Sequence, residues 1–306
     1  MNSKQKIPVC YSVQEVRNFV ESHREVNIIL YLAHKEKEAW EKSTSRVYFN
    51  QISQNLVYLP VDIAKGDLRE LRQIYELAKN TGHIIAINQT QPHKSNPVVK
   101  ELFSESSEKL VNIDTIIKDQ SAQLKAFDLN GSSFITWFLE DVGVFENKVV
   151  ILIGVGGVGE PISKAIAPHK PSKMFLIDPQ DKTILKTELS AYCFVEYYPN
   201  LDKLMSSNLM ENLVLINAAG KEGIENNSTV HHFLKSHAAE NNIFVDLRPH
   251  LQVEIVEQAK AFGWRAFTGH GMNAVNDYTL LSKVAEIANI TMPSFARFKE
   301  LVAKAS

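Results

Sequence analysis

The chain has 306 residues, a formal net charge of -2 and a hydrophobic content of 44%. That length is about two domains' worth, and the near-neutral charge gives no electrostatic reason to expect nucleic acid or a membrane as a partner. No apolar run approaches the roughly 20 residues that span a bilayer, and the first residues lack the apolar core of a signal peptide. Cys10 and Cys193 lie far apart without metal-ligand spacing, so we expect reduced thiols, no metal site and a cytoplasmic protein.

The first half of the chain alternates helical and strand patterns. Ser12 and Glu15 have the spacing of a capping box, and Val16, Phe19 and Val20 then share one face, which predicts a helix. The further predicted elements, in chain order, are strands at 27–33 and 56–63, an amphipathic helix at 66–80, a strand at 83–90, an apolar segment at 111–117 and a helix at about 132–141. This alternation predicts α/β architecture.

A second series of alternating strands and helices begins at Val149. Its predicted strands are six apolar runs, at 149–154, 174–178, 193–198, 213–219, 243–247 and 264–269. We find no internal repeat, coiled coil or low-complexity tract in the chain.

The glycine-rich stretch at residues 149–160, VVILIGVGGVGE, is typical of a dinucleotide-binding turn. An apolar run meets Gly154, Gly156 and Gly159 in G-x-G-x-x-G spacing, with Gly157 as an extra glycine, and a helix-compatible segment follows. One glycine turns the chain, a second lets the backbone approach a pyrophosphate, and a third lets the helix pack on the strand with its N-terminus toward the anion. By itself this pattern is a weak signal.

Asp178 strengthens the prediction of a dinucleotide site. It ends the next apolar run and lies 19 residues after Gly159, near the position where a ribose-binding carboxylate is expected. Such an acid accepts a hydrogen bond from the ribose 2′-hydroxyl and repels a 2′-phosphate, so we expect NAD as the cofactor, preferred over NADP. The other interpretation is that Asp178 caps a turn before Pro179, since Asp-Pro commonly opens a turn.

Three stretches of the first half connect to this turn: STSRVYFN (43–50), NQTQPHK (88–94) and FDLNGSSF (127–134). Together with GVGGVG, INAA (216–219) and GHGM (269–272), they resemble in order and approximate separation the landmarks of the shikimate dehydrogenase family, which includes quinate/shikimate dehydrogenases. The form N-x-T-x-P-x-K is the most specific of these. The resemblance covers the chain from about residue 43 to residue 285.

The resemblance implies a role for individual residues. On the substrate side these are Ser43 and Ser45 for the substrate carboxylate, Thr90, the catalytic Lys94, Asn112, and Asn276 in place of a longer glutamine. On the cofactor side they are Gly154, Gly156, Gly157 and Gly159 in the turn, and Asn217 with Ala218 near the nicotinamide, followed by Ala219 in place of a threonine. Other interpretations stay open, because a loop lysine is usually a solvated charge, serines suit turns and caps, and a buried asparagine can satisfy backbone groups.

The sequence also departs from the family pattern. Asn130 stands where the family has a catalytic aspartate, and Arg46 and Phe49 replace a proline and a histidine after the serines. The arginine-containing element that binds the NADP phosphate is absent after Asp178. These departures leave the substrate open.

Oxidation of a secondary alcohol needs a base that takes the hydroxyl proton while hydride leaves. A lysine can serve when burial or neighbours bring its pKa toward the working pH. We therefore predict Lys94 as the acid/base, with Asn130 as a partner that accepts a hydrogen bond but supplies no charge, and with activity that survives in weakened form. Asp128 would share a face with Asn130 in an extended segment, so it is the alternative partner.

We predict an α/β protein of two domains. A substrate-binding α/β domain spans residues 1–125 and is joined by C-terminal helices at 275–306, and a Rossmann NAD-binding domain spans 126–274. The resemblance implies an NAD-dependent oxidoreductase of the shikimate pathway of aromatic amino acid biosynthesis, acting on a small hydroxy or keto carboxylate of shikimate or quinate type. We expect a monomer or homodimer. Two alternatives stay open: an inactive protein of this fold that binds dinucleotide or a small cyclic acid, and a dehydrogenase of another small acid.

Overall fold

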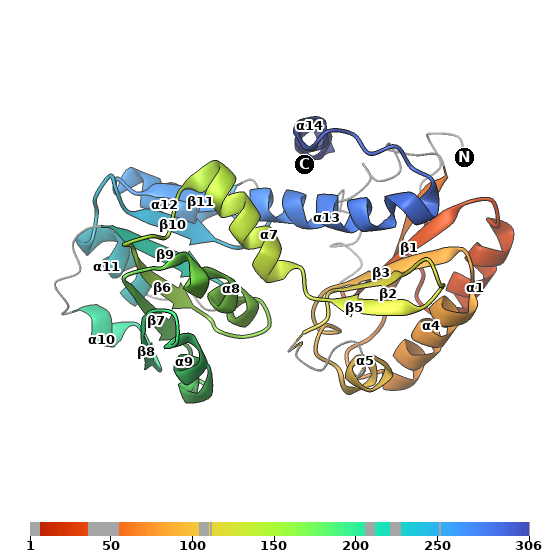
Figure 1. Ribbon diagram of the computed structural model, residues 1–306, viewed down its shortest axis with the longest axis horizontal. Helices are drawn as coiled ribbons and strands as arrows, with labels where there is room; N and C mark the ends of the chain where they lie inside the picture. Colours follow the sequence, from red (N-terminus) through yellow and green to blue (C-terminus); the bar gives the residue numbers. More distant parts are fainter. Residues whose placement is uncertain are drawn as a thin grey trace. The chain divides into compact units, whose positions relative to one another are not determined.

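The computed structural model describes residues 7–35, 55–103, 110, 112–205, 212–220, 228–250 and 252–305. The chain divides into two compact units: unit 1 comprises residues 1–129 and 277–306, and unit 2 comprises residues 130–276. In Figure 1 the chain leaves unit 1 after β5 (Leu124–Phe127), forms unit 2, and returns through α13 (His270–Ala288), whose residues are divided between the units.

Unit 1 contains a five-stranded sheet of order β2-β1-β3-β4-β5. Strand β1 (Asn27–Ala33) pairs in parallel with β2 (Leu56–Asp62) and with β3 (Ile84–Gln89), whereas β4 (Thr115–Lys118) and β5 continue the sheet as antiparallel strands. The carboxyl ends of β1, β2 and β3 therefore meet at one edge of the sheet, and β4 begins at this edge.

Helices α1 (Val13–Ser22), α4 (Leu68–Asn80) and α5 (Pro97–Leu102) cover one face of this sheet. Each N-terminus is capped by a side chain that accepts a backbone hydrogen bond, from Ser12, Asp67 and Asn96 respectively. Their buried apolar residues join the strand residues in one core cluster, in which each fully buried aliphatic side chain contributes about 1.5–3 kcal/mol. The C-terminal helix of unit 1 is α14 (Phe295–Ala305).

Unit 2 contains a six-stranded parallel sheet of order β11-β10-β9-β6-β7-β8. The strands are β6 (Val149–Ile153), β7 (Lys173–Ile177), β8 (Phe194–Tyr198), β9 (Leu213–Asn217), β10 (Ile243–Asp246) and β11 (Arg265–Thr268). Numbered within the unit, this is the doubly wound order 3-2-1-4-5-6 of dinucleotide-binding domains, and its switch point lies between β6 and β9. Ligands of such sheets bind beyond the carboxyl ends of the strands at the switch point.

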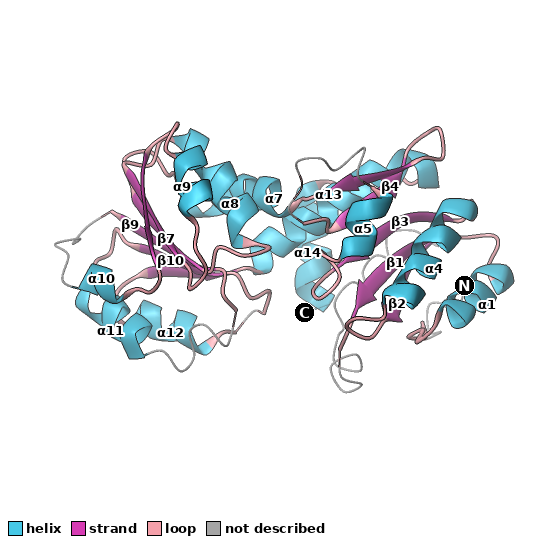
Figure 2. Ribbon diagram, turned by 90° about the horizontal axis from the view of Figure 1, so that it is seen from below, coloured by secondary structure: helices cyan, strands magenta, loops and turns pink. Residues whose placement is uncertain are grey.

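Helices cover both faces of the unit 2 sheet (Figure 2). One face carries α7 (Asn130–Trp137), α8 (Gly159–Ile166) and α9 (Thr183–Leu189), and the other carries α10 (Asp202–Met205), α11 (Ser228–Ser236) and α12 (Glu254–Ala261). Helix α7 continues as a π-helical turn over Phe138–Val142, and α8 continues as a 3-10 turn over Ala167–His169. At Gly131 of α7 a Cβ would lie 2.6 Å from the carbonyl oxygen of Pro161 in α8, so the two helices pack closely only with glycine there.

The α/β class and the two-domain fold predicted from the sequence are confirmed. The strands predicted at 27–33, 56–63 and 83–90 are β1, β2 and β3, and the six apolar runs of the second half are β6 to β11. Strand β4 begins at Thr115, inside the predicted apolar segment. Strand β5 has no counterpart in the prediction, because four residues are too few to show a period of alternation.

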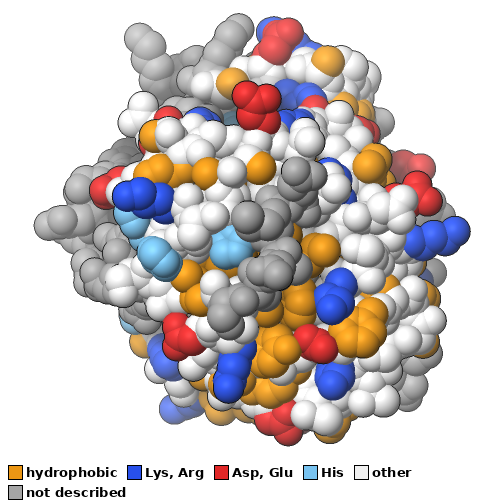
Figure 3. Space-filling view, turned by 90° about the vertical axis from the view of Figure 1, so that its left-hand side faces the viewer, with side chains coloured by type: hydrophobic (Ala, Val, Ile, Leu, Met, Phe, Trp, Pro, Cys, Tyr) orange, Lys and Arg blue, Asp and Glu red, His pale blue; other side chains and the backbone are white. Residues whose placement is uncertain are grey.

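The surface of unit 2 mixes side chains of different kinds. On the face drawn in Figure 3, charges of both signs are interspersed and apolar side chains gather in the lower half. Phe194 on the edge strand β8 is among the exposed large apolar residues, and the Nζ atom of Lys173 lies 4.5 Å from the centroid of its ring. A cation thus lies over an apolar ring on this edge. None of the described helices is both long and apolar enough to cross a membrane.

Candidate functional site

The loop after β3 carries Thr90 and Lys94 at the carboxyl edge of the parallel strands of unit 1. The Thr90 amide donates to the carbonyl of Leu32 at 3.0 Å, which ties the start of the loop to the end of β1. The side chain of Asn96, the N-cap of α5, donates to the His93 carbonyl and closes the loop. The backbone around Lys94 is therefore held on both sides.

Lys94 faces a carboxylate that sequence analysis did not single out. Its Nζ atom lies 3.9 Å from Oδ2 of Asp114, and the two side chains are 11% and 3% exposed. The backbone also joins them, because the Ile113 amide donates to the Lys94 carbonyl at 2.8 Å. Both carboxylate oxygens of Asp114 accept from the Leu129 amide at 3.1 Å, and its carbonyl accepts from the Gln89 amide at 2.8 Å. The loop after β3, the start of β4 and the end of β5 thus converge on this ion pair.

Two buried polar atoms in the segment that carries Asp114 lack a hydrogen-bond partner within the described parts of the chain. They are Nδ2 of Asn112 and Oγ1 of Thr115, both fully buried. An unsatisfied buried donor typically costs about 1–3 kcal/mol, and native proteins satisfy most such groups with protein, water or ligand. Asn112, two residues before Asp114, therefore has an amide donor without a partner among the described residues, which suits a residue that binds a polar ligand.

A second polar cluster, formed by His34, Asp62 and His93, lies at the same edge. The Nδ1 atom of His34 lies 3.0 Å from Oδ1 of Asp62 at the end of β2. His93 is buried, and burial is the largest cause that lowers its pKa. Hydrogen bonds with the backbone of Ala33 and Ile63 and the charge of Asp62 oppose this shift, and the charge of His34 adds to it. Burial thus favours the neutral form of the imidazole that immediately precedes Lys94.

The glycines of unit 2 fall into two groups by the space around them. Gly154 has φ +82°, and a Cβ there would lie 2.5 Å from the Ala219 amide nitrogen; a Cβ on Gly159 would lie 1.9 Å from the Gly154 carbonyl oxygen. A Cβ on the exposed Gly156 would meet nothing within 4 Å, and Gly157 beside it is half-buried. Packing therefore requires Gly154 and Gly159, whereas Gly156 leaves open space at the switch point, as close approach of a pyrophosphate requires.

Asp178 follows β7 and holds the glycine turn. Its Oδ2 accepts from the Val155 amide at 2.7 Å, and its Oδ1 accepts from the Gln180 amide at 2.9 Å. The hydrogen bond from the Gln180 amide closes the turn at Pro179, as the alternative interpretation of the sequence held. A carboxylate has about four lone-pair sites, so acceptor capacity remains for a ribose hydroxyl. Lys182 lies beside it, with Nζ 4.0 Å from Oδ1, and adds a positive charge that the sequence argument did not consider.

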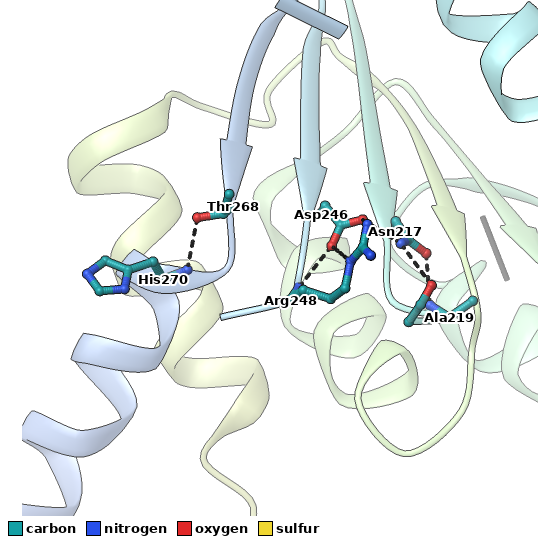
Figure 4. A network of polar contacts seen from close by, with 7 residues as sticks. Asn217, Ala219, Asp246, Arg248, Thr268 and His270 are labelled. Carbon is teal, nitrogen blue, oxygen red and sulfur yellow. Dashed lines mark hydrogen bonds and ion pairs between the residues drawn. The ribbon is translucent and has the colours of Figure 1, made fainter. Parts of the chain in front are cut away.

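The carboxyl ends of β9 and β10 carry a polar network (Figure 4). Asp246 is fully buried, and Arg248 donates to both of its oxygens, with Nε 2.8 Å from Oδ1 and Nη2 3.0 Å from Oδ2. Asn217 donates from Nδ2 to Oδ2 of Asp246 at 2.8 Å and accepts from the Ala219 amide at 3.0 Å. The Ala218 amide donates to the Ile153 carbonyl at 2.7 Å. Asn217 and Ala218 thus fix the loop that faces the glycine turn.

The predicted site residues are distributed between the units. Unit 1 brings together Thr90, Lys94 and Asn112, and unit 2 contains Asp178, Asn217, Ala218 and the four glycines of the turn. Asn130, buried at the start of α7, and Asn276, half-buried in α13, also belong to unit 2. Ser43 and Ser45 lie outside the described residues. The signal that could have revealed Asp114 is that it is the single acid in the apolar run VNIDTII.

Known proteins match this chain in structure but not in sequence. No protein-family model matches the sequence, and no curated protein matches it. Shikimate 5-dehydrogenase from Listeria monocytogenes, in complex with shikimate and NAD, superposes with a TM-score of 0.71 at 15% identity over 90% of this chain and 96% of that one. Quinate dehydrogenase from Corynebacterium glutamicum, in complex with NAD, superposes with a TM-score of 0.69 at 16% identity over 91% of this chain and 99% of that one.

Shikimate 5-dehydrogenase from Thermus thermophilus, in complex with NADP(H) and shikimate, gives a TM-score of 0.67 at 16% identity over 92% of this chain and 100% of that one. Each of these structures spans both units of the present chain. At such identities the likeness establishes the fold alone. The protein has the two-domain α/β fold of the shikimate and quinate dehydrogenases, as the order of its sequence motifs predicted.

Proposed function

We propose that the protein is a nicotinamide-dependent oxidoreductase that acts on a small hydroxy or keto carboxylate of shikimate or quinate type. The observation that carries this proposal is the buried Lys94 at the carboxyl edge of unit 1, held at 3.9 Å from the carboxylate of Asp114. A solvated loop lysine would have neither this burial nor this partner. The fold adds support, because its structural neighbours in complex with NAD or NADP are dehydrogenases.

In this proposal Lys94 is the acid/base of the reaction. When bound, a nicotinamide ring accepts hydride from the carbinol carbon of the substrate. Lys94 takes the hydroxyl proton at Nζ in the oxidative direction and returns it in the reductive direction. Burial excludes competing water from Nζ, and the loop contacts at Thr90 and Asn96 hold the side chain in position.

NAD is the proposed cofactor. The open space at Gly156 suits the pyrophosphate, and the remaining lone pairs of Asp178 suit the ribose 2′-hydroxyl. A 2′-phosphate would meet the same carboxylate, although Lys182 would offset part of the repulsion. We therefore propose a preference for NAD over NADP that is smaller than the sequence alone suggested.

The substrate contacts are proposed from the motifs. Ser43 and Ser45 would bind the carboxylate, and Thr90, Asn112 and Asn276 would contact the hydroxyl groups. The unsatisfied Nδ2 of Asn112 supports its role. The place of the reaction in the shikimate pathway is proposed on the same resemblance, and the cytoplasmic location is proposed on the expectation that Cys10 and Cys193 are reduced thiols.

A non-catalytic binding protein is the alternative from another class, since Asn130 replaces the aspartate of the family pattern. The test is a panel of shikimate, quinate and other small hydroxy acids, each offered with NAD and with NADP while formation of the reduced cofactor is followed. We expect turnover with at least one acid, and faster turnover with NAD. A purified, folded protein that is inert on the whole panel but binds NADH would favour the binding protein.

A further inference from the structure

We infer that Asp114 is the positioning residue of Lys94, and that it supplies from the start of β4 the carboxylate that the family pattern places at residue 130. This inference rests on the proposed function, because it assigns a partner to the proposed acid/base. It differs from the sequence prediction, which gave Lys94 a neutral partner at Asn130 or a charged one at Asp128.

The first argument is charge. Asp114 and Lys94 are both buried side chains, and a buried charge is tolerated when an opposite charge and hydrogen bonds accompany it. At 3.9 Å between Nζ and Oδ2, the opposite charges of the two side chains attract each other. Asn130 carries no charge and cannot do this.

The second argument is geometry. The backbone on either side of the carboxylate is fixed, because the Asp114 carbonyl accepts from the Gln89 amide at 2.8 Å and the Asp114 amide donates to the Phe127 carbonyl at 3.1 Å. The antiparallel pairing of β3 with β4, which matches Asn88 to Thr115, then brings residue 114 beside the loop that carries Lys94. The pairing of the strands therefore fixes the position of the Asp114 backbone, from which its side chain extends.

The third argument is the connection to residue 130. The Leu129 amide donates to both carboxylate oxygens of Asp114 at 3.1 Å, and Leu129 directly precedes Asn130. The same carboxylate thus fixes the segment from which the family presents its own aspartate, and acceptor capacity remains for Lys94. The acid at 114 is thus joined to the start of α7 through the Leu129 amide.

The chemical step balances with Asp114 in this role. A nicotinamide held at the glycine turn of unit 2 would take a hydride, one proton with two electrons, from the carbinol carbon, and Nζ of Lys94 would take the hydroxyl proton as the carbonyl forms. Asp114 stays ionised throughout and stabilises the new ammonium. Asp114 exchanges no proton with the substrate, so its role is to position Lys94.

The test measures the reactivity of Lys94 toward a trace of an acylating reagent, by peptide mass spectrometry, in wild type and Asp114→Asn. The carboxylate attracts the ammonium across 3.9 Å, so its removal should raise the labelling rate of Lys94 about tenfold, which corresponds to about 1.4 kcal/mol of lost attraction. Asp119→Asn is the matched control, because Asp119 also pairs with a lysine, Lys125 at 3.0 Å, and accepts from two backbone amides. It should leave Lys94 unchanged.

Lys118 on β4 is also buried, so its labelling rate would rise if the variant merely loosened the sheet. We expect the labelling rate of Lys118 to be the same in wild type and Asp114→Asn. If Asp114→Asn does not fold, Asp114→Ser keeps a small acceptor for the Leu129 amide and takes its place. Unchanged labelling of Lys94 in a folded variant at Asp114 would overturn the inference.

Kinetics separate the inference from the proposed function. Asp114→Asn should lower kcat at least about tenfold with little change in KM, and Asn130→Asp added to it should restore part of the loss. If Lys94→Met abolishes turnover while Asp114→Asn keeps it, the inference is wrong and the proposed function stands. If every protein is inert while Asp114→Asn still accelerates labelling of Lys94, the pairing stands and the proposed function is wrong.

Discussion

The buried imidazole of His93 couples the candidate site to the stability of unit 1. Burial lowers the pKa of His93, chiefly through desolvation. A depressed pKa in the folded state means that the unfolded chain binds a proton more readily, so this group adds stability above its unfolded pKa of about 6.5 and loses it as the pH falls. The contribution of His93 to the free energy of unfolding of unit 1 should therefore be larger at neutral pH than at acidic pH.

The corresponding prediction concerns His93→Gln. Between about pH 7.5 and about pH 5.5, the free energy of unfolding of wild type should fall more steeply than that of the variant, because the variant has no buried imidazole to protonate. Urea unfolding at the two pH values measures both slopes. His232→Gln is the control, since His232 is exposed on α11. Equal slopes in wild type and His93→Gln would show that another group causes the acid sensitivity.

Asp178 carries the prediction on cofactor choice. Asp178→Asn keeps one acceptor oxygen for the Val155 or the Gln180 amide and removes the charge that would face a 2′-phosphate, so the ratio of NADPH to NADH affinity should rise. Lys182→Met should change the ratio in the opposite direction, because Lys182 lies 4.0 Å from the same carboxylate. Calorimetric titration of both cofactors into the three proteins gives the ratios. Wild type that already binds NADPH more tightly would contradict the proposed preference.

At the scale of elements, the glycine turn joins β6 to α8, and its glycines differ in role: Gly159 is needed for packing, whereas Gly156 leaves space for a ligand. Gly156→Ala should leave the free energy of unfolding unchanged, because its Cβ would meet nothing within 4 Å, but should weaken NADH binding by occupying the space beside the pyrophosphate. Gly159→Ala should destabilise unit 2, because its Cβ would lie 1.9 Å from the Gly154 carbonyl oxygen. Chemical denaturation and NADH titration of both variants separate the two effects. A Gly156→Ala protein with normal NADH affinity would place the cofactor elsewhere.

The elements also show how far sequence analysis reaches. The apolar runs of β1, β3 and β6 to β11 and the capping box at Ser12 are local signals, so the sequence predicts these elements well. Asp114 is different, because its meaning depends on the pairing of β3 with β4 and on the contact with Leu129, both distant in sequence. The pair of His34 with Asp62 likewise joins the ends of two strands. Contacts of this kind become visible only when the sheet is formed.

At the scale of the whole molecule, two units each with a core cluster should unfold in more than one step. Two of the three tryptophans, Trp137 and Trp264, are buried in unit 2, and Trp40 belongs to unit 1, so tryptophan fluorescence reports more on unit 2 than on unit 1. NADH at about 100 times its Kd should stabilise the unit that binds it by about 2.7 kcal/mol and raise the fluorescence-detected midpoint. The circular dichroism transition, which follows both units, should broaden. A uniform shift of both signals would mean that the chain unfolds as one cooperative unit.

The central claim is that Lys94 is the acid/base of a nicotinamide-dependent oxidation. The most direct measurement compares kcat of wild type, Lys94→Met and Lys100→Met on the best acid of the panel, with NADH affinity measured alongside. Lys100 is exposed on α5 and provides the matched control. We predict that Lys94→Met loses about 100-fold or more in kcat, while it binds NADH like wild type and Lys100→Met remains fully active. A Lys94→Met protein that turns over as fast as Lys100→Met would contradict the account.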